Sequence, residues 1–74
     1  MFTPAVAVDF KSIVKTLLKG KHLPDVYRDH ALAGQFLGYR ECHIKGDLLL
    51  VYQKDSAERI IDLTDIGTHS QLFG

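Results

Sequence analysis

Residues 36–52 read FLGYRECHIKGDLLLVY and decide the fold of this 74-residue chain. The first half mixes polar and apolar residues, as a strand with one solvated face does. Residues 48–52 are apolar throughout, as in a strand that is buried on both faces. Gly46 between the two runs predicts a tight turn. The stretch therefore predicts an antiparallel β-hairpin at the centre of the domain.

Side chains of a strand alternate between its two faces, which sorts the polar residues of this hairpin. Tyr39, Glu41 and His43 fall on one face, whereas Arg40 and Cys42 fall on the other. Cys42 could serve as a nucleophile, but its place opposite His43 favours a small core residue. Arg40 on the same face is predicted to be a structural ion-pair partner and not a phosphate ligand.

The composition limits the class of protein. A chain of 74 residues forms one domain, residues 1–74, with a modest core. Nine basic and nine acidic residues cancel, so the overall charge predicts neither a nucleic-acid partner nor a membrane surface. The single cysteine cannot form an internal disulfide. No apolar run is long enough to span a bilayer and no secretion signal is present, so we expect a cytoplasmic protein.

An amphipathic helix is predicted before the hairpin. Thr3 and Pro4 suit the N-cap and first helical position, apolar residues recur at helical spacing as far as Leu18, and Gly20 suits the C-cap. The apolar stripe is predicted to pack against the sheet, and membrane-surface binding is the weaker alternative.

The other segments predict a loop, a turn, a third strand and a tail. The ranges are 21–35 for the loop, 55–58 for the turn, 59–66 for the strand, which Gly67 ends, and 68–74 for the tail. One helix followed by three or four antiparallel strands gives an α+β class.

Four histidines are many for so short a chain. His22 is predicted to be solvated, whereas His30, His43 and His69 come from three segments that the sheet could bring together at one end. Histidine gives and takes protons near neutral pH, which suggests acid–base catalysis. Ordinary surface histidines are one alternative. A zinc site that includes Asp47 is another, although close helical spacing and a cysteine cluster are both missing.

A family resemblance rests on an ordered set of short motifs. They are RDH at 28–30, GYRECHI at 38–44 with Asp47 after it, LLVY at 49–52 and GTHSQLF at 67–73. With these motifs the chain resembles the YafQ-like toxins of the RelE/ParE superfamily, small bacterial ribonucleases of type II toxin–antitoxin systems. The resemblance covers residues 23–74 well and the preceding helix loosely.

The resemblance implies a helix packed on a twisted antiparallel sheet, and ribosome-dependent cleavage of mRNA without a metal or another cofactor. The catalytic residues that it implies are His30, His43, Asp47, His69 and Phe73. The histidines would transfer protons, Asp47 would orient or stabilise one of them, and Phe73 would stack on a base unless it only docks on the core. Lys45 is expected to be a weak RNA contact. The implied partners are mRNA on the ribosome and a small antitoxin of the ribbon-helix-helix type, with no membrane.

Three departures from the family pattern bear on these expectations. Family members begin with a strand and a further helix, so we expect an open sheet edge that invites self-association. The family is basic, whereas this chain is neutral and has Ala33 and Leu37 where lysines are common. Gly46 replaces a frequent proline, which loosens the placement of Asp47. The alternative function is therefore a catalytically weak, shortened toxin that acts as an antitoxin-binding module.

Overall fold

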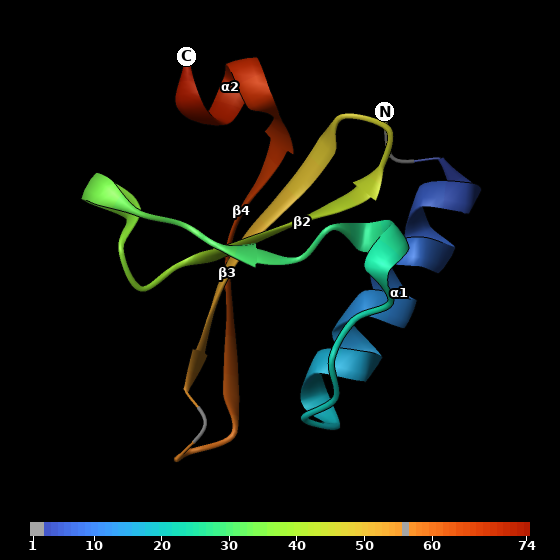
Figure 1. The fold of residues 1–74 in the computed structure, drawn as a ribbon. Coiled ribbons are helices and arrows are strands. Elements are labelled where there is room, and N and C mark those ends of the chain that lie inside the picture. Colours follow the sequence, from blue (N-terminus) through green and yellow to red (C-terminus); the bar gives the residue numbers. More distant parts are fainter. Residues whose placement is uncertain (1–2, 56) are drawn as a thin grey trace.

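The computed structural model describes residues 3–55 and 57–74, and it places a long helix against one face of an antiparallel sheet (Figure 1). The helices are α1 (Pro4–Leu18) and α2 (His69–Phe73), and the strands are β1 (His30–Ala31), β2 (Arg40–Lys45), β3 (Leu48–Asp55) and β4 (Ile60–Thr68). Short 3-10 turns span Asp25–Tyr27 and Gly34–Phe36. The spatial order of the strands is β1-β2-β3-β4. The predicted α+β class is confirmed.

Strands β2 and β3 form the predicted hairpin. Cys42 pairs with Leu50 and His43 with Leu49, and an irregularity follows between His43 and Lys45. Gly46 in the turn has a φ of 58°, in the left-handed region that favours glycine. The strand begins later than the sequence suggested, because residues 34–36 form the second 3-10 turn and β2 starts only at Arg40.

The core lies between α1 and the sheet. Val6, Ile13 and Leu17 from the helix are buried against the α1-facing side of β2 and β3. The buried partners on that side are Cys42, Ile44, Leu48, Leu50 and Tyr52. The apolar stripe of the helix is therefore confirmed as a core-packing face, except at Leu18, which is 61% exposed.

Both ends of α1 follow from local chemistry. The Thr3 hydroxyl oxygen accepts a hydrogen bond from the Val6 N–H at 3.2 Å, which confirms the predicted N-cap. The helix ends at Leu18 with Lys19 as its C-cap, and Gly20 follows with a φ of 71°. The C-cap is thus Lys19 and not Gly20 as predicted, and Gly20 is the residue after it.

Two predicted irregular segments have regular structure. The predicted loop contains β1, in which His30 pairs with Glu41, and a strand of two residues is too short to show alternation. The predicted tail is α2, which follows directly from β4 because β4 continues through Gly67 to Thr68. Thr68 and Gln71 form a reciprocal capping box that starts this helix.

Within the described residues, β4 has a neighbouring strand on one side only. Ile60 and Leu63 on this edge strand are 51% and 43% exposed. Such an edge can accept another strand, so self-association remains a prediction. No helix in the described part of the chain is long and apolar enough to cross a membrane.

Replacing Ile13 by alanine should lower the free energy of unfolding by about 2–5 kcal/mol, because Ile13 is fully buried. Val8→Ala on the same helix is the control, since Val8 is 66% exposed, and it should change stability by less than about 0.5 kcal/mol. Urea denaturation of both variants measures the difference. Equal losses would contradict this placement of the helix.

Stability should fall in mild alkali because of Cys42. Burial, helped by the charges of Asp29 and Glu41, raises the pKa of its thiol from 9.0 to about 12. Between these values the unfolded chain loses a proton that the native state keeps, so the free energy of unfolding decreases as pH rises. We expect the Cys42 thiol to account for a loss of about 1 kcal/mol between pH 8 and pH 10.

Urea unfolding at pH 8, 9 and 10 checks this, with Cys42→Ala as the comparison. Cys42→Ala should be less stable than the parent at pH 8. Its free energy of unfolding should, however, decrease less between pH 8 and pH 10, because the variant has no thiol to ionise. Parallel pH profiles for the two proteins would show that the thiol does not cause it.

Candidate active site

Two histidines contact one buried carboxylate on the sheet face opposite α1. Nε2 of His30 lies 3.5 Å from Oε1 of Glu41, and Nε2 of His43 lies 3.9 Å from the same oxygen. The sheet dictates this meeting: His30 pairs with Glu41 across strands, and Glu41 and His43 share a face of β2. A buried carboxylate needs polar partners, and these imidazoles supply them.

The second nitrogen of each ring faces a backbone carbonyl. Nδ1 of His30 is 2.7 Å from the Arg28 carbonyl oxygen, to which it can donate a hydrogen bond. Nδ1 of His43 is 3.4 Å from the Gly46 carbonyl oxygen. Each ring thus faces two oxygen atoms, a carboxylate oxygen of Glu41 and a backbone carbonyl oxygen.

Asp47 and His69 lie at the same end of the sheet as His43. Leu48 pairs with Thr68, so Asp47, just before Leu48, and His69, just after Thr68, both extend beyond this pair. Figure 1 shows α2 and the β2–β3 turn at that end. Asp47 makes no hydrogen bond or ion pair with the described residues, so Glu41 is the carboxylate that contacts the two paired histidines.

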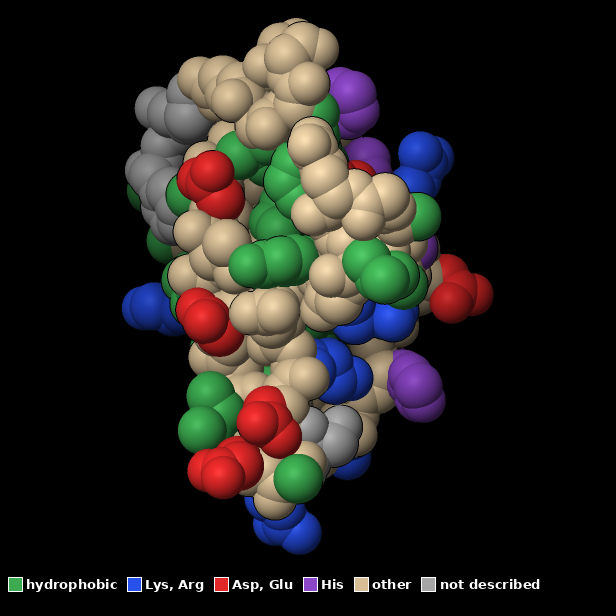
Figure 2. Space-filling model, turned by 90° about the vertical axis from the view of Figure 1, so that its left-hand side faces the viewer, with side chains coloured by type: hydrophobic (Ala, Val, Ile, Leu, Met, Phe, Trp, Pro, Cys, Tyr) green, Lys and Arg blue, Asp and Glu red, His purple; other side chains and the backbone are tan. Residues whose placement is uncertain are grey.

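Phe73 packs against Phe36 and His69 and lies outside the core cluster between α1 and the sheet. Its ring meets Phe36 edge-on with centroids 5.1 Å apart, and its centroid lies 5.2 Å from that of His69. Phe36, Phe73, Tyr39 and Val51 help to line a hollow of about 220 Å³. Figure 2 shows the face at the left-hand side of Figure 1, with hydrophobic side chains in the middle, histidines along the right edge and most acidic side chains toward the left and lower left.

A second carboxylate fixes the segment that carries His30. Asp29 accepts from Arg40, with Nη2 2.9 Å from Oδ2, and from the hydroxyl of Tyr52. The bond to Asp29 raises the pKa of Arg40, and burial together with Asp29 raises the pKa of Tyr52. Arg40 is confirmed as an ion-pair partner, and the fully buried Cys42 as a core residue.

The sequence places Glu41 and His43 on one face of the strand, but the pairing of His30 with Glu41, which gives Glu41 its role, comes from the structure. The sequence predicts Lys45 as a weak RNA contact, which stays a prediction; Nζ of Lys45 lies 3.1 Å from Oδ2 of Asp9 on α1. His22 is exposed, as predicted. In the described part of the chain, no group of three or more histidine, cysteine or acidic residues is placed to hold a metal ion.

Comparison with known proteins supports one family. The family model described as a bacterial toxin of type II toxin–antitoxin systems, YafQ, matches residues 3–74. The putative toxin YafQ of Haemophilus influenzae is 41% identical over 73 residues, which cover 93% of this chain and 72% of that protein. The mRNA interferase toxin YafQ of Escherichia coli K12 is 40% identical over 52 residues, and these span only 54% of its length.

Solved structures agree with the fold. YafQ in the E. coli DinJ–YafQ complex superposes with a TM-score of 0.80 at 32% identity, over 92% of this chain and 74% of that one. A metal-bound toxin from Helicobacter pylori superposes with a TM-score of 0.79 at 42% identity, over 88% and 72%.

Asp29→Asn should lower the free energy of unfolding by about 1–3 kcal/mol, because Arg40 and Tyr52 lose a charged acceptor. The matched control is Asp62→Asn on β4, an exposed position that should change stability by less than about 0.5 kcal/mol. Urea denaturation measures both. If the two variants are equally stable, Asp29 does not anchor this segment.

Proposed function

Because the chain belongs to the YafQ family of bacterial type II toxin–antitoxin toxins, we propose that it is a ribosome-dependent endoribonuclease that cuts mRNA by acid–base catalysis. The proposal rests on the imidazole rings of His30 and His43, which both contact Glu41. His69 and Asp47 lie at the end of the sheet nearest His43. The name mRNA interferase of the E. coli relative supports the same reaction class.

The reaction uses a nucleophile that RNA itself supplies. A base takes the proton of the ribose 2′-hydroxyl, and the 2′-oxygen attacks the neighbouring phosphorus. The bond from phosphorus to the 5′-oxygen breaks, and an acid protonates that oxygen. The products are a 2′,3′-cyclic phosphate and a 5′-hydroxyl. Protonated and neutral imidazoles suit both proton transfers near neutral pH, so the step is balanced without a metal.

The proposed roles follow from the contacts. His30, His43 and His69 share the two proton transfers. Glu41 is a positioning residue, because it fixes two of the rings and does not itself reach the surface of the site. Asp47 has no ion pair with the described residues, which leaves its carboxylate available to stabilise an imidazolium during the reaction. Phe73, held by Phe36, walls the site or stacks on a base.

His43→Gln should reduce the rate of mRNA cleavage on translating ribosomes by about 10²–10⁴-fold, the usual contribution of a positioned acid–base group. His22→Gln is the matched control, an identical substitution at an exposed histidine outside the site, and should keep the parent rate. A chelator selective for transition metals should leave cleavage unchanged. A His43→Gln variant as active as the parent would refute the role of this residue.

The second candidate function is an antitoxin-binding module that no longer cleaves RNA. The zero net charge and the ion pair of Lys45 with Asp9 favour it, because affinity for RNA rests mainly on neutralised phosphates. In either case the proposed partner is a small ribbon-helix-helix antitoxin whose disordered tail folds on the toxin. With such partners the proposed location of the protein is the cytoplasm. Cleavage that the antitoxin blocks supports the enzyme, whereas tight antitoxin binding without cleavage supports the module.

A further inference from the structure

A second hollow lies beside His43. It has a volume of about 530 Å³, and its lining includes Arg28, His43, Lys45, Asp9 and Tyr27. The elements that meet here are the first 3-10 turn, the end of β2 and the middle of α1. His43 therefore contacts Glu41 and also lines an open pocket that none of the roles above uses.

The charges around this pocket leave one cation uncompensated. Asp9 and Lys45 pair with each other at 3.1 Å. The guanidinium of Arg28 makes no hydrogen bond or ion pair within the described residues, and the side chain is exposed. An arginine without an ion pair that lines the same pocket as a histidine is suited to a phosphate group, which arginine can bind through two parallel hydrogen bonds.

The backbone of Arg28 has a distinctive conformation and makes a hydrogen bond to the site. Its φ of 51° is in the left-handed region, which few residues other than glycine adopt. Its carbonyl oxygen accepts the hydrogen bond from Nδ1 of His30. Arg28 is thus linked through its backbone to His30, and it lines the same pocket as His43.

We propose that this pocket binds a backbone phosphate of single-stranded RNA next to the bond that is cut, with Arg28 as the phosphate ligand. The proposal rests on the proposed nuclease function and adds a binding subsite to it. Lys45 acts there only weakly because Asp9 offsets its charge. Tyr27 and the 76%-exposed Val26 form an apolar wall against which the sugar or base of that nucleotide can lie.

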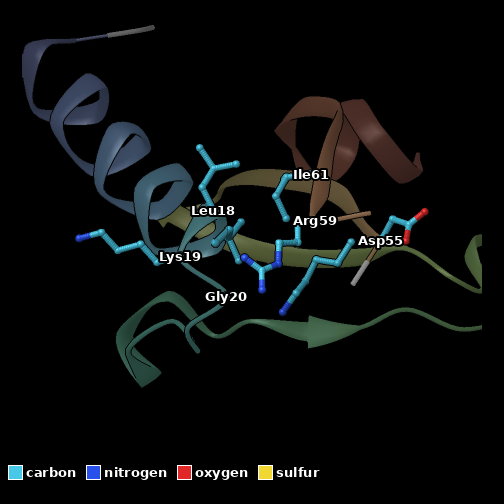
Figure 3. A pocket seen from close by; sticks show the side chains of 8 residues that line it. Leu18, Lys19, Gly20, Asp55, Arg59 and Ile61 are labelled. Atoms are coloured by element: carbon cyan, nitrogen blue, oxygen red, sulfur yellow. The ribbon is translucent and has the colours of Figure 1, made fainter. Parts of the chain in front are cut away.

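Arg59 provides a closely matched control. It too is exposed and has a left-handed backbone, with a φ of 58°. It lies just before the start of β4, whereas His69 follows its end, a separation of about 30 Å along a nine-residue strand. Figure 3 shows Arg59 in a different pocket, with Lys19 and Gly20 of the α1 end and Ile61 of β4.

The experiment measures binding without cleavage. A 2′-O-methyl trinucleotide, which lacks the attacking hydroxyl, is titrated into the parent, Arg28→Gln and Arg59→Gln at several salt concentrations. Amide shifts of His43 and Gly46 in NMR spectra give Kd. Arg28→Gln should weaken binding about 5–10-fold and reduce the slope of log Kd against log salt by about 0.7, as expected for one lost phosphate contact on a single strand. Arg59→Gln should bind like the parent, and Arg28→Lys should keep the salt slope.

The outcomes separate this proposal from the function on which it rests. If Arg28→Gln and Arg59→Gln bind alike while the parent cuts mRNA, the subsite is wrong and the nuclease stands. If the parent neither binds the trinucleotide nor cuts mRNA, the nuclease proposal fails, and the subsite fails with it. A loss of binding in Arg28→Gln that is equal at every salt concentration would indicate altered structure and would also overturn the phosphate assignment.

Discussion

The pairing of β2 with β3 is the constraint from which the other features of the molecule follow. Its register turns Cys42 and Ile44 toward α1, where they complete the core, and turns Glu41 and His43 toward the opposite face. A shift of one residue would exchange the two sets, burying His43 under the helix and exposing Cys42. Stability and site therefore depend on one register, which the buried run of β3 holds in place.

Two carboxylates, one on each side of this sheet, organise the polar groups. On the α1 side, Asp29 pairs with Arg40 and Tyr52 and anchors the chain just before β1. On the other side, Glu41 holds the rings of His30 and His43. Breaking a buried charged pair by removing one partner is costly, since the other charge is left uncompensated. The two clusters therefore act on neighbouring residues, Asp29 and His30, at the start of a very short strand.

The surface around the candidate site offers little positive charge. The histidines and Asp47 are the residues proposed for acid–base chemistry on RNA, whereas the positive charge available to bind a nucleic acid is small. The chain is neutral, Lys45 is paired with Asp9, and most acidic side chains in the view of Figure 2 lie toward its left and lower left. Under the proposed function, affinity for RNA would come from few contacts or from a ribosome that presents the mRNA in a defined position.

Periodicity and local chemistry in the sequence determined the hairpin, the helix with its Thr3 cap, the burial of Cys42 and the family resemblance, because each is encoded by residues close together in the chain. The short strand β1 and the contacts of Glu41 and Asp29 were decided only by the tertiary structure. A strand of two residues has no pattern of its own, and it forms because β2 offers an edge to pair with. Which carboxylate meets which histidine depends on strand order and register, and these arise when distant segments pack.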